Sequence, residues 1–200
     1  MSGVRLEAHV HVVTAALSSL DAFHYLGFAH PEIWAICSLL VLGTVHYFGP
    51  KKAGVLALWI AAAAFGAYLV VAAFAVPHLG DAKVTVPRAG IGTHWTSFVH
   101  IVLALSGVEA VANMTGIMVK PIRRTSLLTI WPVAIEVVLL NLVFALAMNA
   151  IPLPPEALAG HEEAMLRIVA ETYVGKGFAA VASVVFALLL LSAASTAITG

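Results

Sequence analysis

The apolar residues of this chain fall into long blocks, and short polar or charged segments separate them. Each block approaches the roughly 20 apolar residues that an α-helix needs to cross a bilayer. The blocks are apolar on all sides, whereas a helix of a soluble protein carries a polar stripe. This pattern predicts an all-α, polytopic membrane protein. The expected spans cover residues 10–28, 31–48, 53–76, 95–118, 127–150 and 177–199.

The first block is only patchily apolar. Four polar residues interrupt it: Ser18, Ser19, Asp21 and His24. A cleaved signal peptide is the alternative, but Glu7 lies in the flank that a signal peptide keeps basic, and no clear A-x-A cleavage site follows. We therefore expect a polar-lined span packed inside a helix bundle.

The acidic connection at about residues 156–175 predicts a short amphipathic helix. Its apolar residues recur at helical spacing, with charges between them: Met165, Ile168, Val169 and Tyr173. A solvated linker is the alternative. Because an exposed apolar face is unfavourable, we expect a lid-like extracellular helix that lies at the membrane surface or packs at the mouth of the bundle.

Composition places the chain in the membrane class. Hydrophobic residues make up 62% of the 200 positions and charged residues 10%, which leaves too little polar surface for a soluble domain. The lipid bilayer is therefore the first expected partner. The formal net charge is zero, so nothing indicates nucleic acid as a partner. A single cysteine, Cys37, cannot form an intrachain disulfide.

Basic residues predict the orientation in the membrane. Five of them lie in two short turns, at 49–52 and 119–126: Lys51, Lys52, Lys120, Arg123 and Arg124. The longer connections on the other side hold four: Lys83, Arg88, Arg167 and Lys176. Because Lys and Arg near span ends stay in the cytoplasm, we expect both short turns on the cytoplasmic side of the cell membrane.

A carboxylate interrupts the apolar stretch 95–118 near its middle. Glu109 follows Ser106 and Gly107 there, and a charge at the centre of a membrane helix costs roughly 2.5–3.5 kcal/mol on insertion scales. The cost falls if the helix unwinds at the small residues and Glu109 faces a hydrated cavity, where freed backbone groups bind a ligand. The alternative is that Gly107 permits close packing and Glu109 bonds a neighbouring helix.

Hydroxyl side chains share one face of the last span. They recur at i, i+3, i+4 and i+7: Ser192, Ser195, Thr196 and Thr199. Such a face is a possible ion-binding surface, and the alternative is that the hydroxyls bond to the carbonyl at i−4 or to another helix. Glu136 and Asn141 in the preceding span are interpreted as polar packing residues, and Glu136 is the better functional candidate of the two.

The sequence contains no pattern of an enzyme. The nine histidines include no H-x-x-x-H pair, and no Cys/His cluster has zinc-ligand spacing. Neither a nucleophile elbow nor a phosphate-binding loop is present. We expect no catalytic activity, no bound metal and no organic cofactor.

Two adjacent runs resemble the sixth span of amino acid permeases of the amino acid–polyamine–organocation superfamily. They are LALSGVEAVA at 103–112 and MVKPIRR at 118–124, where those permeases carry G-[FVI]-E at a broken helix and a basic K-x-P-x-R segment. The run LLSAASTA at 190–197 is similar to their eighth span. Three features depart from the family pattern: residues 117–119 replace its acidic residue, its Asn before Pro121 is missing, and Leu103 replaces a frequent aromatic residue.

The resemblance implies spans three to eight of a five-plus-five inverted-repeat fold of the leucine-transporter type, with a discontinuous helix near 105–109. It implies that carbonyls around Leu103 and Ser106 bind the substrate's amino group and that Gly107 permits the break. Glu109 is then expected to gate or to carry a proton. Ser195 and Thr196, with Ser192 beside them, match the region where sodium-coupled relatives bind their ion, so the coupling ion is H⁺ or Na⁺.

The expected function is secondary active transport of an amino acid. Because the two opening spans of the family have no counterpart before residue 10, we expect the chain to be a truncated part of the permease. Two alternatives stay open. One is a potassium–proton symporter of the same fold, and the other is a non-transporting membrane subunit or pseudogene product.

Overall fold

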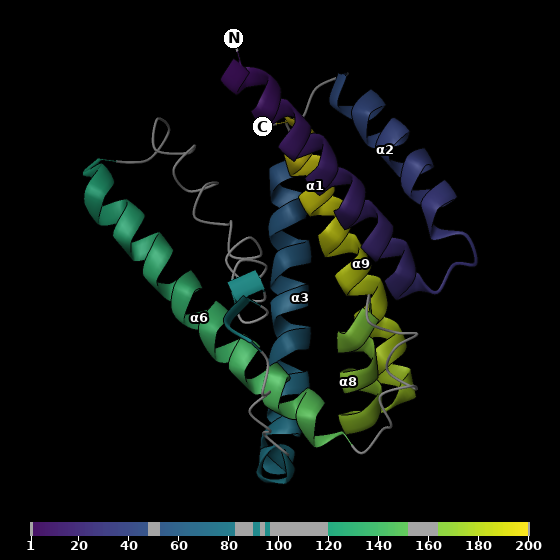
Figure 1. Cartoon of the computed structure of the whole chain (residues 1–200), viewed down its shortest axis with the longest axis vertical. Helices are drawn as coiled ribbons and strands as arrows, with labels where there is room; N and C mark the ends of the chain where they lie inside the picture. The colour runs from purple at the N-terminus through teal and green to yellow at the C-terminus, as the bar shows by residue number, and fades with distance from the viewer. Residues whose placement is uncertain are drawn as a thin grey trace.

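The computed structural model describes the backbone of residues 2–47, 53–82, 90–92, 95–96, 120–151 and 164–199. Its elements are helices, in the order α1 (Ser2–Leu26), α2 (Pro31–Tyr47), α3 (Ala53–Ala75), the 3-10 helix η1 (Val76–Asp81), α6 (Ile122–Ala150), α8 (Met165–Tyr173) and α9 (Lys176–Thr199) (Figure 1). Among these residues there is no β-strand. The all-α prediction is therefore confirmed for the described part, and the inverted-repeat topology stays a prediction.

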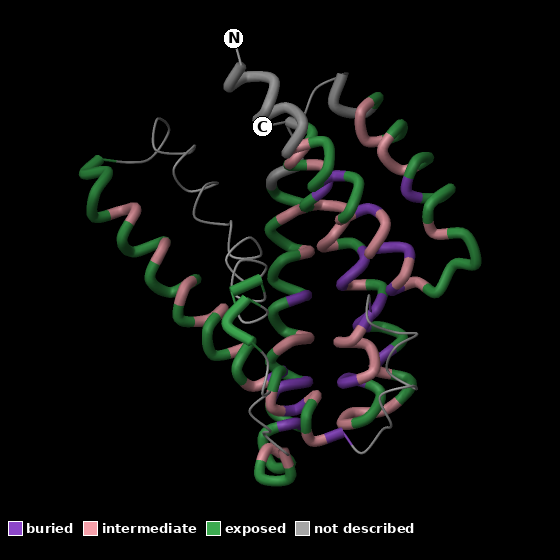
Figure 2. Tube along the Cα trace, viewed as in Figure 1, coloured by how far each residue is buried: buried purple, intermediate pink, exposed green. Residues whose placement is uncertain are grey.

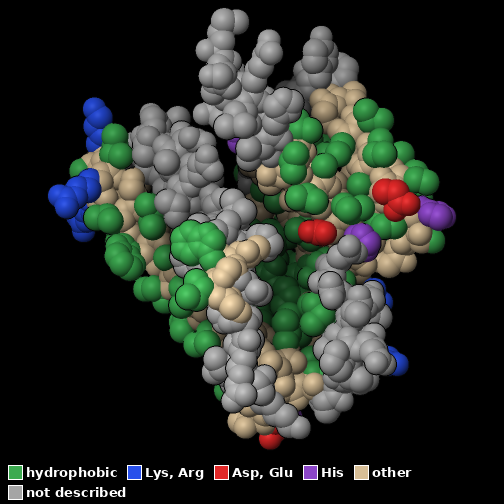
Figure 3. Space-filling model, in the orientation of Figure 1, with side chains coloured by type: hydrophobic (Ala, Val, Ile, Leu, Met, Phe, Trp, Pro, Cys, Tyr) green, Lys and Arg blue, Asp and Glu red, His purple; other side chains and the backbone are tan. Residues whose placement is uncertain are grey.

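Among the described residues, three helical segments are long and apolar enough to cross a membrane. They are Val55–Asp81, which joins α3 to η1, Ile122–Ala150 and Lys176–Ile198. The helix Pro31–Thr44 is also apolar but shorter. Hydrophobic side chains lie on the outside of these helices, for example Leu128 and Trp59, which are 66% and 71% exposed (Figure 3). A protein with such a surface is expected to be covered by lipid.

The described helix ends that flank the two predicted basic turns lie at the same end of the bundle. In Figure 1, the end of α2, the start of α3 and the start of α6 all lie toward the top, as do both chain termini. η1, the end of α6 and α8 lie toward the opposite end, and α1 ends close to α8. This arrangement agrees with the shared sidedness that the basic residues predict.

Helix α1 packs against α9 along most of its length, and small side chains line the contact. Ala22 lies in one buried cluster with Ala182 and Ala187 of α9. Ala15 and Ser19, on the preceding turns of α1, are also buried. Because small residues let two backbones approach closely, this pattern suits helix association inside a bilayer.

Aromatic rings connect α1, α3 and α9 at the centre of the bundle. Tyr68 of α3 stacks on Phe186 of α9, with ring centroids 4.7 Å apart and an interplanar angle of 15°. Tyr25 of α1 meets the same Phe186 edge-on at 5.7 Å. Such pairs stabilise a packed core by roughly 0.5–1.5 kcal/mol beyond their buried area.

Helix α6 joins the bundle through its C-terminal half. Phe144 and Ala147 are buried there with Val71 of α3 and with Val169 and Ala170 of α8 (Figure 2). The N-terminal half extends away from α3, and its buried residues begin only at Phe144.

The start of α6 differs from the sequence prediction. The structure begins the helix at Ile122, five residues before the expected 127, because the Pro121 carbonyl accepts hydrogen bonds from the N–H groups of Arg124 and Thr125. Arg123 and Arg124 therefore lie on the first turn of the helix, whereas the sequence pattern predicts them in the turn before it.

Candidate functional site

The residues predicted to bind substrate lie outside the described residues. This applies to Leu103, Ser106 and Gly107, and also to Glu109, the predicted gating or proton-carrying group. Their roles, and the break in the helix near 105–109, stay predictions. The structure does place the predicted ion-binding hydroxyls and the elements around them.

The hydroxyl face of α9 lies near the C-terminal end of that helix. Ser192 and Ser195 are half-buried and Thr196 is exposed. Thr196 donates a hydrogen bond from Oγ1 to the carbonyl of Ser192 at 2.7 Å. This i−4 bond is the alternative to ion binding that the hydroxyl spacing also predicts. The ion-binding role of Thr196 stays a prediction.

Two polar side chains of α6 also form hydrogen bonds with backbone carbonyls of their own helix. The Asn141 side chain donates to the carbonyl of Val137 at 2.8 Å, and the Asn149 side chain donates to that of Ala145 at 2.8 Å. Bonding of this kind lets an amide lie in an apolar environment with part of its hydrogen-bonding capacity satisfied. Glu136 is half-buried on the same helix.

Helix α8 packs into the bundle and does not behave as a solvated linker. Val169 and Ala170 are fully buried, and both belong to the cluster formed with α3, α6 and α9. The apolar residues that recur at helical spacing in this segment therefore form a face that packs against the bundle. α8 lies at the opposite end of α9 from the hydroxyl face (Figure 1).

Two side-chain hydrogen bonds attach α8 to the ends of other helices. Tyr173 donates from its hydroxyl to the carbonyl of Ala147 in α6 at 2.8 Å. Arg167 donates from Nη1 to the carbonyl of Tyr25, near the end of α1, at 3.2 Å. Both acceptors are backbone groups of the last helical turns, where carbonyls lack intrahelical partners. Sequence reasoning missed both contacts because neither acceptor has a sequence signature.

Tyr173 lies in a small polar group at the same end of the bundle. The His78 ring is 5.1 Å from its ring, between centroids. Burial raises the pKa of the Tyr173 phenol above its usual value of 10.0, and the negative charge of Asp81 raises the pKa further. The phenol therefore stays protonated, and able to donate to Ala147, across the physiological range.

The described residues contain no group of three or more His, Cys, Asp or Glu side chains placed to hold a metal ion. Comparison with models of protein families, with curated proteins and with solved structures found no match. The resemblance to amino acid permeases is therefore carried by the quoted residues alone.

Proposed function

We propose that this chain belongs to the transmembrane machinery of a secondary active transporter for amino acids. One observation carries the proposal: the carboxylate of Glu109 follows the small pair Ser106–Gly107 near the middle of a stretch long enough to cross a bilayer. An ionisable group at that depth is a functional candidate by default, because it is costly unless it faces water or a partner.

Several features of the described part support a membrane role. Three helical segments of that part have the length and hydropathy of membrane spans, and the end of α2 lies at the same end of the bundle as the starts of α3 and α6. The close packing of α1 on α9 leaves both helices with polar groups inside the bundle, such as the buried Ser19 and Ser183. Bundles of this kind provide walls around a midplane site.

In the proposed mechanism, carbonyls around Leu103 and Ser106 bind the amino group of the substrate at an interruption permitted by Gly107. Glu109 gates this site or carries the coupling proton. The hydroxyls of Ser192, Ser195 and Thr196 are the proposed alternative for a coupling sodium ion. α8 covers the outer end of the bundle through its bonds to α1 and α6.

The test is a substitution at the native locus, in the cells that naturally make the protein. Uptake of a mixture of radiolabelled amino acids is compared between wild type, a deletion strain, Glu109→Gln and Glu171→Gln. Glu171 is a matched control, because its carboxylate lies on α8 and is 3.8 Å from the amine of Lys176 at the bundle surface. We expect Glu109→Gln to lose uptake about tenfold or more per molecule in the membrane, since it removes a titratable group but retains its shape.

Three outcomes would contradict the proposal. The first is uptake that is unchanged by deletion. The second is reduced uptake in Glu109→Gln that follows only from lower protein abundance, which supports a packing role. The third is loss of uptake of a potassium tracer with amino acid uptake intact, which supports the symporter alternative.

A further inference from the structure

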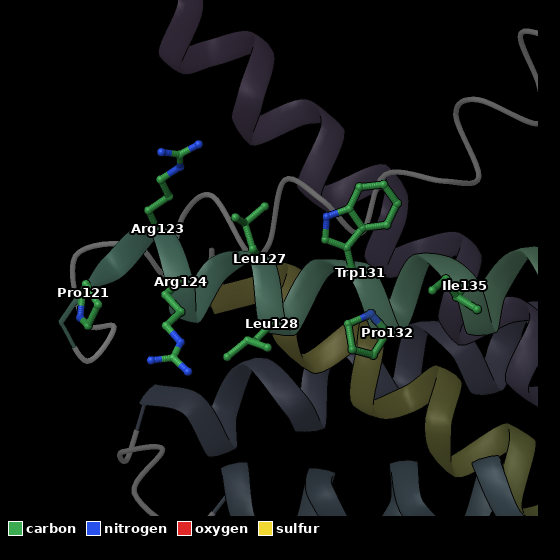
Figure 4. A pocket seen from close by; sticks show the side chains of 8 residues that line it. All are labelled: Pro121, Arg123, Arg124, Leu127, Leu128, Trp131, Pro132 and Ile135. Atoms are coloured by element: carbon green, nitrogen blue, oxygen red, sulfur yellow. The ribbon is translucent and has the colours of Figure 1, made fainter.

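An open groove of about 760 Å³ follows the first half of α6. Two rows of side chains form its walls (Figure 4). One row is Arg123, Leu127 and Trp131, and the other is Arg124, Leu128 and Pro132. Each row therefore begins with a guanidinium at the helix start and continues with apolar side chains toward the middle of the helix.

Two arginines form the charged end of the groove. Arg123 and Arg124 are exposed, and within the ranges that the structure describes neither guanidinium pairs with a carboxylate. Both lie on the first turn of α6, whose N-cap residue Pro121 makes no side-chain capping bond. The N-terminal end of a helix attracts anions and disfavours cations, so an anion bound here would stabilise both the backbone N–H groups and the arginines.

The remaining length of the groove is apolar and open. Leu128 and Trp131 are 66% and 60% exposed, and Ile135 continues the lining one turn further. The twelve residue steps from Arg123 to Ile135 correspond to about 18 Å along the helix axis. One leaflet of the hydrocarbon core is about 15 Å thick, half of the roughly 30 Å of the whole core. The groove thus has the length and the polarity gradient of one lipid molecule.

We propose that this groove binds an anionic phospholipid of the leaflet that contacts the start of α6. The lipid phosphate lies against Arg123 and Arg124, and an acyl chain follows Leu127, Leu128 and Trp131. Free phosphate would fit the groove less well, because it leaves the apolar walls uncovered. Phosphatidylcholine would also fit less well, because its headgroup brings a cation close to the arginines. This proposal is independent of transport, because it uses only residues of α6.

The experiment measures quenching of Trp131 fluorescence by brominated lipids. The full chain is reconstituted into nanodiscs of phosphatidylcholine that contain a small fraction of either brominated phosphatidylglycerol or brominated phosphatidylcholine. The Trp131→Phe variant identifies the signal of Trp131 among the four tryptophans of the chain. We expect an apparent affinity about tenfold higher for phosphatidylglycerol, because each arginine near an anionic headgroup contributes favourably.

Three variants test the role of the charges. Arg123→Gln with Arg124→Gln is expected to abolish the preference for phosphatidylglycerol. Arg123→Lys with Arg124→Lys is expected to retain most of it, because the charge remains. Lys176→Gln is the control, since Lys176 is an exposed cation at the start of α9, at the opposite end of the bundle. Circular dichroism verifies that each variant keeps its helices.

Four results would overturn the proposal. The first is equal quenching by the two brominated lipids. The second and third are a preference for phosphatidylglycerol that persists in the double Gln variant, or that Lys176→Gln also removes. The fourth is a quenching signal that Trp131→Phe leaves unchanged. Inorganic phosphate is added in a separate arm. If it binds and abolishes the preference at millimolar concentration, the site recognises phosphate alone and not a lipid.

Discussion

The hydroxyl of Tyr173 donates a hydrogen bond to the carbonyl of Ala147 across 2.8 Å, and this bond ties the surface helix α8 to the end of α6. The residues are 26 positions apart in the chain. Arg167 makes the corresponding connection from α8 to the end of α1. α8 is therefore held between the ends of two long helices.

Removing the Tyr173 hydroxyl is expected to loosen this end of the bundle. Tyr173→Phe keeps the ring and leaves the Ala147 carbonyl without its side-chain donor, which costs about 1 kcal/mol in the free energy of unfolding. The measurement is equilibrium unfolding of the purified protein in mixed detergent micelles. Tyr68→Phe is the control, because in the described part Tyr68 stacks on Phe186 without a side-chain hydrogen bond. An equal loss of unfolding free energy in both variants would contradict a stabilising role of the Tyr173 hydrogen bond.

The same contact predicts a dependence on alkaline pH. The pKa of Tyr173 is raised in the folded state, by burial first and by Asp81 second, so the unfolded chain loses this proton at lower pH. The stability that Tyr173 contributes is thus fully present below about pH 10 and is lost as pH rises through the folded-state pKa. We expect the difference in unfolding free energy between wild type and Tyr173→Phe to shrink as the pH rises above about 10. The other tyrosines titrate in both proteins, so a difference that stays constant or grows would contradict this assignment.

The turn between α1 and α2 depends on a glycine. Gly27 has φ of +72°, and a Cβ atom added there would lie 3.3 Å from Nη1 of Arg167. Gly27→Ala is expected to destabilise the protein by about 1–2 kcal/mol, because an L-residue is strained in the left-handed region.

Gly66→Ala serves as the control for that variant. Gly66 lies inside α3, and an added Cβ atom meets nothing within 4 Å. This substitution is expected to raise stability by up to about 1 kcal/mol, since Gly costs helix stability relative to Ala. Thermal unfolding in detergent compares the two. Equal changes in thermal stability, of the same sign, in the two variants would show that the backbone conformation of Gly27 does not contribute to stability.

The apolar pattern predicted where helices occur, because a helix that faces lipid must be apolar over its whole length. The apolar pattern predicted the ends of the helices less accurately. The helical path continues past Pro77 into η1, since a proline is tolerated in the first turn of a helix. Similarly, α6 starts before its apolar block because Arg123 and Arg124 are good helix formers.

The contacts between helices could not be predicted in the same way. Arg167 and Tyr173 bind backbone carbonyls, and any residue at the acceptor position offers the same group. For the candidate site, the spacing of Ser192 and Thr196 was compatible with both an ion site and a local bond. The structure shows the local bond, and ion binding stays a prediction. Glu109 lies outside the described residues.

The most direct test concerns the account's central claim, that the helices cross a bilayer with the basic turns on the cytoplasmic side. Cys37→Ser removes the single native cysteine, and Lys120→Cys or Lys176→Cys then places one thiol at each end of the bundle. A membrane-impermeant maleimide is applied to intact cells and, separately, to opened cells. The account predicts that Cys at 176 reacts in intact cells and that Cys at 120 reacts only after the cells are opened. Reaction of both positions in intact cells would contradict it.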